Sequence, residues 1–154
     1  MPVLKTAVPG GTSYGLYITG SAMTTITNTA GQVAVATTAN TTATVATVLN
    51  NNGRVEIGTG VTLTTLTQTG SASDAVLRCA ATTVTASEGS MTIYGSGAIT
   101  TLNNGNAQGG ATIYANSSGT ITTLNAKGGA TDFSGSNTPR TVTTLNLYLS
   151  LIHI

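Results

Sequence analysis

A five-residue phrase recurs along the chain and constrains its fold more than any other feature. The phrase reads apolar, Thr, Thr, apolar, and then Thr or Asn, with few departures. Its seven copies begin 18 to 22 residues apart, at Met23, Val45, Leu63, Ala81, Ile99, Ile121 and Val142. A repeat of this length is typical of a solenoid, in which each unit buries its apolar face only by stacking on its neighbours.

The columns of the phrase indicate the type of solenoid. The third position is always Thr, the fourth is always aliphatic, the second is Thr except at Ala46, and the fifth is Thr, Leu or Asn. Thr and β-branched residues favour strands, and no helical period is sustained anywhere in the sequence. We therefore predict an all-β, single-chain parallel β-solenoid (a β-helix) of about seven coils of 18–22 residues. Equivalent residues would then stack one strand spacing apart.

A second strand is expected in each coil, and a glycine often introduces it. The segments with this character are residues 31–35, 53–57, 75–78, 89–94, 110–114 and 129–133. Strand alternation places Met91 and Ile93 on one face and Thr92 and Tyr94 on the other, without deciding which face meets the core.

The solenoid is predicted to span residues 21–148. Residues 1–20 are expected to be an irregular leader or N-terminal cap, because Pro2, Pro9 and the Gly10-Gly11 pair disfavour regular structure. Residues 149–154 leave the repeat and resemble the translation of an adapter used in sequencing libraries, so we predict a non-native tail. The alternative is a genuine apolar last strand or cap over residues 147–154. On the adapter interpretation His153, the single histidine, does not belong to the native protein.

Composition argues against several classes of function. The net charge is +1 and only 6% of residues are charged, so no basic patch favours nucleic acid. The first 20 residues lack the pattern of a secretory signal, and no apolar run is long enough for a membrane span. One Cys and one His are too few for a zinc site or for a nucleophile with its base. We expect no metal, no cofactor and a buried thiol at Cys79.

The acidic residues give no catalytic pair. Glu56 and Asp132 occupy comparable positions in their strands, but four coils separate them, which is roughly 19 Å at the usual strand spacing. Glycosidases generally need two carboxylates much closer together. Asp74 and Glu88 are expected near corners, as solvated surface charges. We therefore predict a non-enzymatic protein with no catalytic residues.

Two surfaces are candidates for binding. Tyr94, Tyr114 and Phe133 are predicted to form an aromatic column, which would bind glycan rings, close a corner or pack against another subunit. The Thr columns invite an ice-binding interpretation, but the fifth column changes to Leu49 and later to Asn103, so a regular double Thr array is not kept. We favour structural ladders over an ice-binding or glycan-degrading solenoid.

Residues 119–125, 128–134 and 140–148 resemble the Thr/Gly-rich β-helical repeats of phage virion proteins found in environmental sequence, such as tail-fibre-like or decoration proteins. The likeness is best over residues 90–148. It implies an exposed component of the virion, assembled in the host cytoplasm and often trimeric. Its partners would be further copies, other virion proteins or a host-surface glycan. The alternative is a bacterial surface adhesin or passenger-type β-helix, which would need an export signal.

Overall fold

The structure is a computed structural model that describes residues 16–106, 109–135, 139–148 and, for the backbone alone, 151–153. The described chain forms strands arranged in two sheets. The eight-stranded sheet contains β1 (Leu16–Ile18), β3 (Gln32–Val35), β5 (Gly53–Ile57), β7 (Ser73–Leu77), β9 (Ser90–Gly95), β11 (Thr112–Ser117), β13 (Ala130–Asp132) and β15 (Leu151–His153). The seven-stranded sheet contains β2 (Ala22–Asn28), β4 (Ala43–Asn50), β6 (Val61–Gln68), β8 (Ala81–Ala86), β10 (Ile99–Asn104), β12 (Ile121–Ala126) and β14 (Val142–Leu147).

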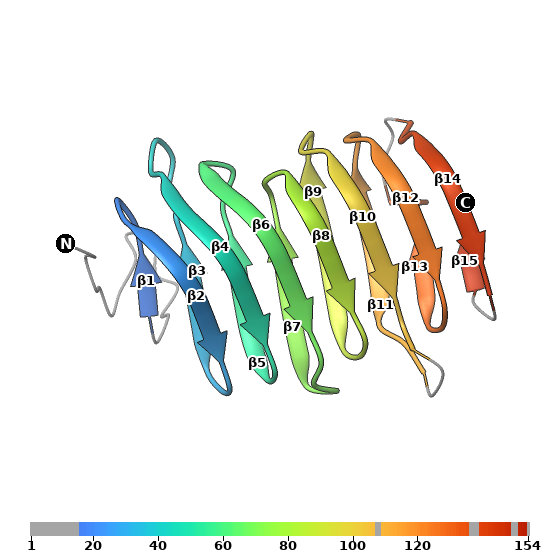
Figure 1. The fold of residues 1–154 in the computed structure, drawn as a ribbon, viewed down its shortest axis with the longest axis horizontal. Helices are drawn as coiled ribbons and strands as arrows, with labels where there is room; N and C mark the ends of the chain where they lie inside the picture. Colours follow the sequence, from blue (N-terminus) through green and yellow to red (C-terminus); the bar gives the residue numbers. More distant parts are fainter. Residues whose placement is uncertain (1–15, 107–108, 136–138, 149–150, 154) are drawn as a thin grey trace.

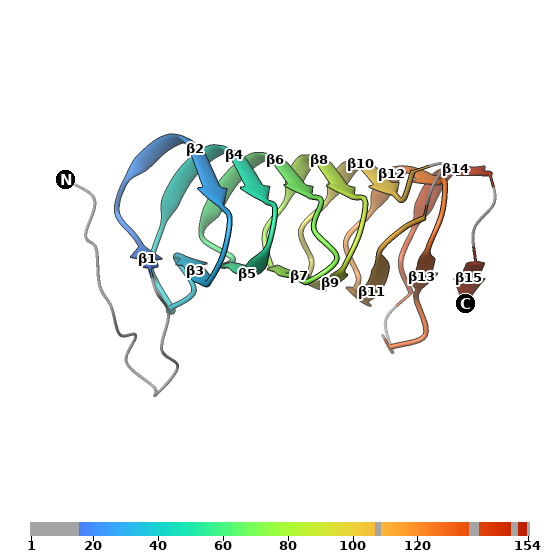
Figure 2. The same cartoon turned by 90° about the horizontal axis from the view of Figure 1, so that it is seen from below.

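The chain alternates between the two sheets as it advances. Each strand pairs with the strand two positions later in the sequence, and every strand pairing is parallel. The result is a β-solenoid of about six turns, in which the two sheets form opposite walls (Figures 1 and 2). The predicted fold is confirmed, and the number of turns is close to the seven coils expected from the repeat.

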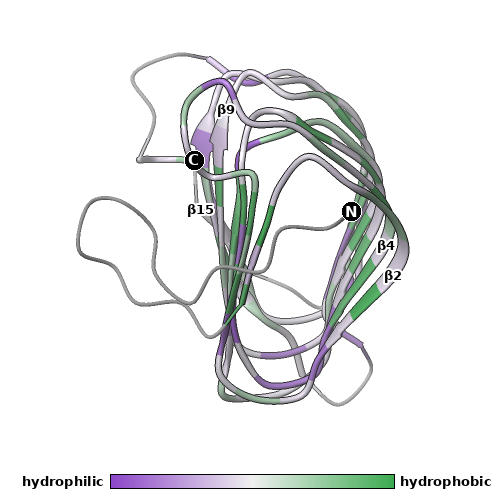
Figure 3. Cartoon of the chain, turned by 90° about the vertical axis from the view of Figure 1, so that its left-hand side faces the viewer, coloured by the Kyte–Doolittle hydropathy of each residue, from purple (hydrophilic) through white to green (hydrophobic). Residues whose placement is uncertain are grey.

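The phrase copies stack in the predicted register. Thr101 lies beside Thr123 and Leu102 beside Leu124, and the same columns continue through the other strands of the seven-stranded sheet. The aliphatic fourth column is buried from Ile26 to Leu124. Viewed along the solenoid axis, apolar segments line both walls around the core (Figure 3). Stacked side chains thus build one continuous apolar core from units that are too small to fold alone.

The second strands also lie close to their predicted positions. In β9, Met91 and Ile93 are buried and Tyr94 is exposed, which settles the face that the alternation left open. The segment predicted at 75–78 is β7, which begins at Ser73 and therefore includes Asp74. Asp74 lies near a corner, as predicted, but as the second residue of β7, because the strand starts two residues earlier than expected.

Each phrase strand breaks the simple alternation of faces. In β8, Ala81 and Val84 are buried, whereas Thr82 is exposed and Thr83 is half-buried between them. The ladder pairings skip the second position, so that Ile99 pairs with Ala81 and the next pair is Thr101 with Thr83. The strict inward–outward alternation is therefore broken at the same place in each phrase strand. The second and third Thr columns therefore both face solvent.

Glycine allows the coils to approach closely at the corners. Gly53 has a φ of 85°, and a Cβ added there would lie 2.3 Å from the carbonyl oxygen of Gly31 in the preceding coil. A side chain at this position would meet both a strained backbone conformation and a steric clash.

At each end, the described solenoid includes a strand that lies outside the predicted span of residues 21–148. β1 lies within residues 1–20, the predicted leader or cap, and pairs with β3; residues 1–15 lie outside the described residues. The backbone of β15 pairs with β13, with His153 beside Asp132, whereas residues 149, 150 and 154 of the predicted tail are not described. The adapter origin of this tail concerns the gene and stays a prediction.

Candidate functional site

The charged side chains gather on the outer face of the eight-stranded sheet. Arg54 on β5 forms an ion pair of 2.6 Å with Asp74 on β7 and lies 3.9 Å from Glu56 on its own strand. Arg78, just after β7, forms an ion pair of 3.2 Å with the same Glu56. Its guanidinium carbon also lies 4.7 Å from the centre of the Tyr94 ring. We call Arg54, Glu56, Asp74, Arg78 and Tyr94 the charged network.

The charged network has the character of a structural device. Each carboxylate in it accepts from at least one arginine, and the arginine side chains are 38–42% exposed. Exposed ion pairs of this kind contribute up to about 1 kcal/mol each. A cation over an aromatic ring adds a similar amount at an exposed site. The network therefore joins β5, β7 and β9 across their outer face.

Glu56 and Asp132, the two acids that the sequence places in comparable positions, do not have the spacing of a glycosidase pair. The column that contains Glu56 continues through Val76, Thr92 and Tyr114 to Asp132, so the two acids share a column but lie four strands apart. This is roughly 19 Å at the usual strand spacing, far beyond the separation that catalysis needs. The Oδ1 atom of Asp132 instead accepts hydrogen bonds from the backbone nitrogen and the hydroxyl of Ser134. Glu88 lies at an exposed corner between β8 and β9, as predicted.

The three aromatic residues do not form one column. The register places Tyr94 beside Asn116, and it places Tyr114 between Thr92 and Asp132. Tyr94 and Tyr114 are 37% and 41% exposed, whereas Phe133 is partly buried against the core. The predicted aromatic column is therefore wrong as a stack. What remains is two exposed tyrosines on adjacent strands, offset by two residues on the same outer face.

The single cysteine is placed as the sequence predicted. Cys79 is buried, and burial raises the pKa of its thiol from 9.0 to about 12. A thiol with this pKa is almost entirely protonated at neutral pH, and the thiolate is the nucleophilic form. Within the described part of the chain, no group of three or more His, Cys, Asp or Glu side chains could hold a metal ion. The described residues also contain no helix with the length and hydropathy of a membrane span.

An interior ladder of amides was not anticipated from the sequence. Asn28, Asn50 and Gln68 occupy one buried column at the end of the phrase strands. Asn28 donates to Asn50 over 3.0 Å, and Asn50 donates to Gln68 over 3.4 Å. Gln68 then donates to the carbonyl groups of Glu88 and Ser90. The sequence signal was an amide that recurs five positions after the phrase start, which is two positions after the aliphatic fourth column.

A second amide ladder lies on the outer surface. Asn103 donates to the Thr85 hydroxyl, Asn125 donates to Asn103, and Asn146 donates to Asn125, over distances of 2.8–3.1 Å. The change from Thr to Asn in the fifth column thus creates bonds between successive coils. In the coils of this ladder the fifth column is Asn, so a double array of third-column and fifth-column Thr is not kept there.

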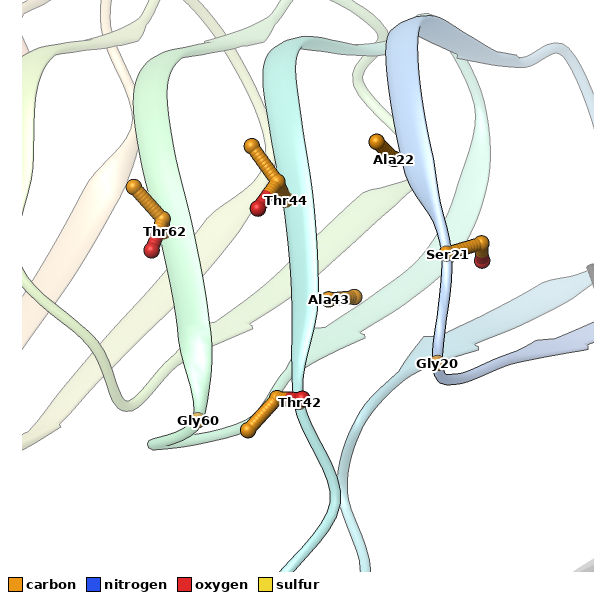
Figure 4. Close-up of a pocket in the computed structure, with 8 residues that line it drawn as sticks. All are labelled: Gly20, Ser21, Ala22, Thr42, Ala43, Thr44, Gly60 and Thr62. Atoms are coloured by element: carbon orange, nitrogen blue, oxygen red, sulfur yellow. The ribbon is translucent and has the colours of Figure 1, made fainter.

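Two shallow depressions lie side by side along the seven-stranded sheet. They have volumes of about 380 Å³ and 400 Å³ and share Thr62. Figure 4 shows the first, where Thr44 and Thr62 project from neighbouring strands above Gly60. Threonine, alanine and other uncharged residues line both depressions. These walls offer hydroxyl and methyl groups to a neighbour and contain no acid–base group.

The comparisons with known proteins add no relative. Neither the family models, nor the curated proteins, nor the solved structures contain a match to this chain.

Proposed function

We propose that this chain is a non-enzymatic structural protein of a phage particle, in which the solenoid serves as a rigid shaft or an exposed binding surface. The observation that carries the proposal is the unbroken parallel stack. Seven phrase strands remain in one register through the length of the seven-stranded sheet. A rod of this kind keeps two ends of an assembly at a fixed distance without any chemistry.

Side-chain ladders support a mechanical role. The interior amides connect β2, β4 and β6, and the outer amides connect β8, β10, β12 and β14. Bending or stretching the rod would break these bonds together with the backbone ladder. Hydrogen bonds in such networks polarise one another, so a ladder resists deformation more than isolated bonds do. The phage assignment itself rests on the resemblance of residues 90–148 to virion repeats.

Exposed apolar and aromatic side chains are the surfaces that we propose for partners. Tyr94 and Tyr114 project from β9 and β11, and Leu145, Leu147 and Tyr148 are 49–60% exposed at β14. Large exposed apolar residues that cluster mark interaction sites. We propose further copies of the chain, other virion proteins or a host-surface glycan as the partners, and the virion as the location.

Genomic context tests this function. Long-read sequencing across codon 148 and into the flanking genes should show capsid, portal or tail genes beside this one, with further Thr-Thr coils in place of the last six codons. A stop codon directly after Ile154 would make the tail native. Neighbouring export or outer-membrane genes would contradict the virion proposal and favour the surface adhesin.

A further inference from the structure

One coil of the solenoid places a cation where the two coils before it have glycine. Arg140 lies two residues before β14, as Gly119 does before β12 and Gly97 before β10. Two residues before the phrase start, the earlier coils have Cys79, Val61 and Ala43. The repeat otherwise keeps this position small or apolar, so Arg140 is a departure that the packing of the coil does not require.

Only one nitrogen of the Arg140 guanidinium donates a hydrogen bond. Its Nε donates a hydrogen bond of 2.9 Å to the carbonyl oxygen of Ser117, at the end of β11. Both terminal nitrogens are shielded from solvent and meet no hydrogen-bond acceptor, and the same holds for the hydroxyl oxygen of Ser117. A guanidinium carries five N–H donors, so four of them remain unused beside a free hydroxyl.

The positive charge of Arg140 also has no carboxylate partner among the described residues. Arg54 and Arg78 each form an ion pair, whereas no carboxylate of the described residues forms one with Arg140. Burial lowers the pKa of Arg140 from 12.5 to about 10, so the group is still a cation at neutral pH. A buried cation without a counter-charge is costly, and proteins usually pair it or bind an ion there.

Two glycines near Ser117 and Arg140 in the sequence lie close against neighbouring coils. A Cβ added at Gly119 would lie 2.1 Å from the carbonyl oxygen of Gly97, and one added at Gly135 would lie 2.1 Å from the side-chain oxygen of Asn116. These positions flank the turn that joins β11 to β12 and the turn that joins β13 to β14. Because the terminal nitrogens of Arg140 and the Ser117 hydroxyl are already shielded from solvent, a monoatomic ion fits between them better than a phosphate or a sulfate.

We propose that Arg140 and the Ser117 hydroxyl form a binding site for a halide ion, with chloride as the solution ligand, inside the corner between the last two coils. The ion accepts hydrogen bonds from both terminal nitrogens of Arg140 and from the Ser117 hydroxyl. It compensates the buried charge and ties β14 to the preceding coil. This site is independent of the proposed function, because any particle or cell surface would supply chloride.

Thermal unfolding of the full chain in sodium bromide tests the site, with sodium gluconate at equal ionic strength as the reference, because gluconate is too large to enter. Arg140→Met removes the site, and Lys127→Met removes one exposed cation at the other end of β12. We expect the melting temperature of the wild type to rise by several degrees over that of Arg140→Met as bromide increases. Lys127→Met should follow the wild type. An equal bromide response in the wild type and Arg140→Met would overturn the proposal.

A direct readout covers the case in which Arg140→Met fails to fold. Crystals of the wild-type chain grown in sodium bromide should show an anomalous scattering peak within hydrogen-bonding distance of the Arg140 guanidinium and the Ser117 hydroxyl. The absence of a peak at this place, in crystals with bromide bound elsewhere, would contradict the site.

Discussion

The side-chain nitrogen of Asn28 donates a hydrogen bond of 3.0 Å to the side-chain oxygen of Asn50, one coil further along, and both side chains are buried. Asn50 in turn donates to Gln68 and to the backbone carbonyl groups of Gly53 and Asp74. The amide of Asn50 thus joins the two sheets as well as successive coils. A polar column is tolerated inside this narrow core because its side chains form hydrogen bonds with one another and with backbone carbonyl groups.

Replacing Asn50 by alanine should therefore destabilise the solenoid. The substitution removes several hydrogen bonds and leaves the donor of Asn28 and the acceptor of Gln68 buried without their partner. Each such group costs about 1–3 kcal/mol, so we expect a loss of about 3 kcal/mol in the free energy of unfolding. Urea denaturation followed by circular dichroism measures this loss. Asn52→Ala, at the exposed turn before β5, is the control and should change stability by less than about 0.5 kcal/mol. Equal effects of the two substitutions would contradict a structural ladder.

An aspartate in the fourth column should act differently at two positions of that column. Leu102 is fully buried, whereas Leu145 is 49% exposed in β14. A buried unpaired charge costs several kcal/mol, so Leu102→Asp should abolish the cooperative thermal transition of the chain. Leu145→Asp should leave that transition in place with a modestly lower midpoint. The same melting temperature for both variants would mean that the fourth column does not form the core.

Cys79 should make stability depend on pH in the alkaline range. Burial raises the pKa of the folded thiol from 9.0 to about 12. Above pH 9 the unfolded chain loses this proton while the folded chain keeps it, so the unfolded state binds fewer protons and stability falls as pH rises. The contribution is fully present below about pH 9 and is lost by about pH 12.

Cys79→Ala removes the pH-dependent contribution of the thiol to stability and is the control. Urea midpoints measured from pH 8 to pH 11 should decline more steeply for the wild type than for Cys79→Ala. The thiol of the folded wild type should also resist alkylation at pH 8 until urea unfolds the chain. Parallel pH profiles for the two proteins, or rapid alkylation of the folded chain, would show that the thiol is accessible.

The charged network should contribute little and should respond to salt. Asp74 and Arg54 form an ion pair, but their side chains are 36% and 42% exposed. We expect Asp74→Asn to lower the free energy of unfolding by at most about 1 kcal/mol at low ionic strength. The difference should vanish in 1 M NaCl, where the screening length is about 3 Å. Glu88→Gln, at an exposed corner, should show no such difference at either salt concentration. A loss that persists in 1 M NaCl would indicate that Asp74 has a further buried role.

The repeat predicted the stacking of Thr101 on Thr123 and of Leu102 on Leu124, because identical phrases in a parallel stack determine their own register. The same reasoning misplaced the tyrosines. The segments Thr92-Ile93-Tyr94 and Thr112-Ile113-Tyr114 are identical, yet the structure offsets them by two residues. A shift by two keeps the same faces inward, so the apolar pattern alone does not determine this register.

The sequence did not predict the charged network or the interior ladder, and the reason is a different one. Arg54 meets Asp74, and Arg78 meets Glu56, because of how neighbouring strands align, and these contacts bridge 20 and 22 residues. By residue type, Asn50 would be interpreted as a corner residue. Only its position two residues after Val48, on the same face of the strand, indicates that it points inward. The break in alternation at the second and third phrase positions was also hidden, because Thr suits either face of a strand.

The proposed function is tested most directly by the protein content of purified particles. Virus particles should be purified by density gradient from a host culture or sample that carries this gene, and their peptides identified by mass spectrometry. Our account predicts peptides from residues 21–148 in the particle band, at amounts that follow the major virion proteins across the gradient. Finding these peptides only in the cell envelope fraction, and not in intact particles, would contradict it.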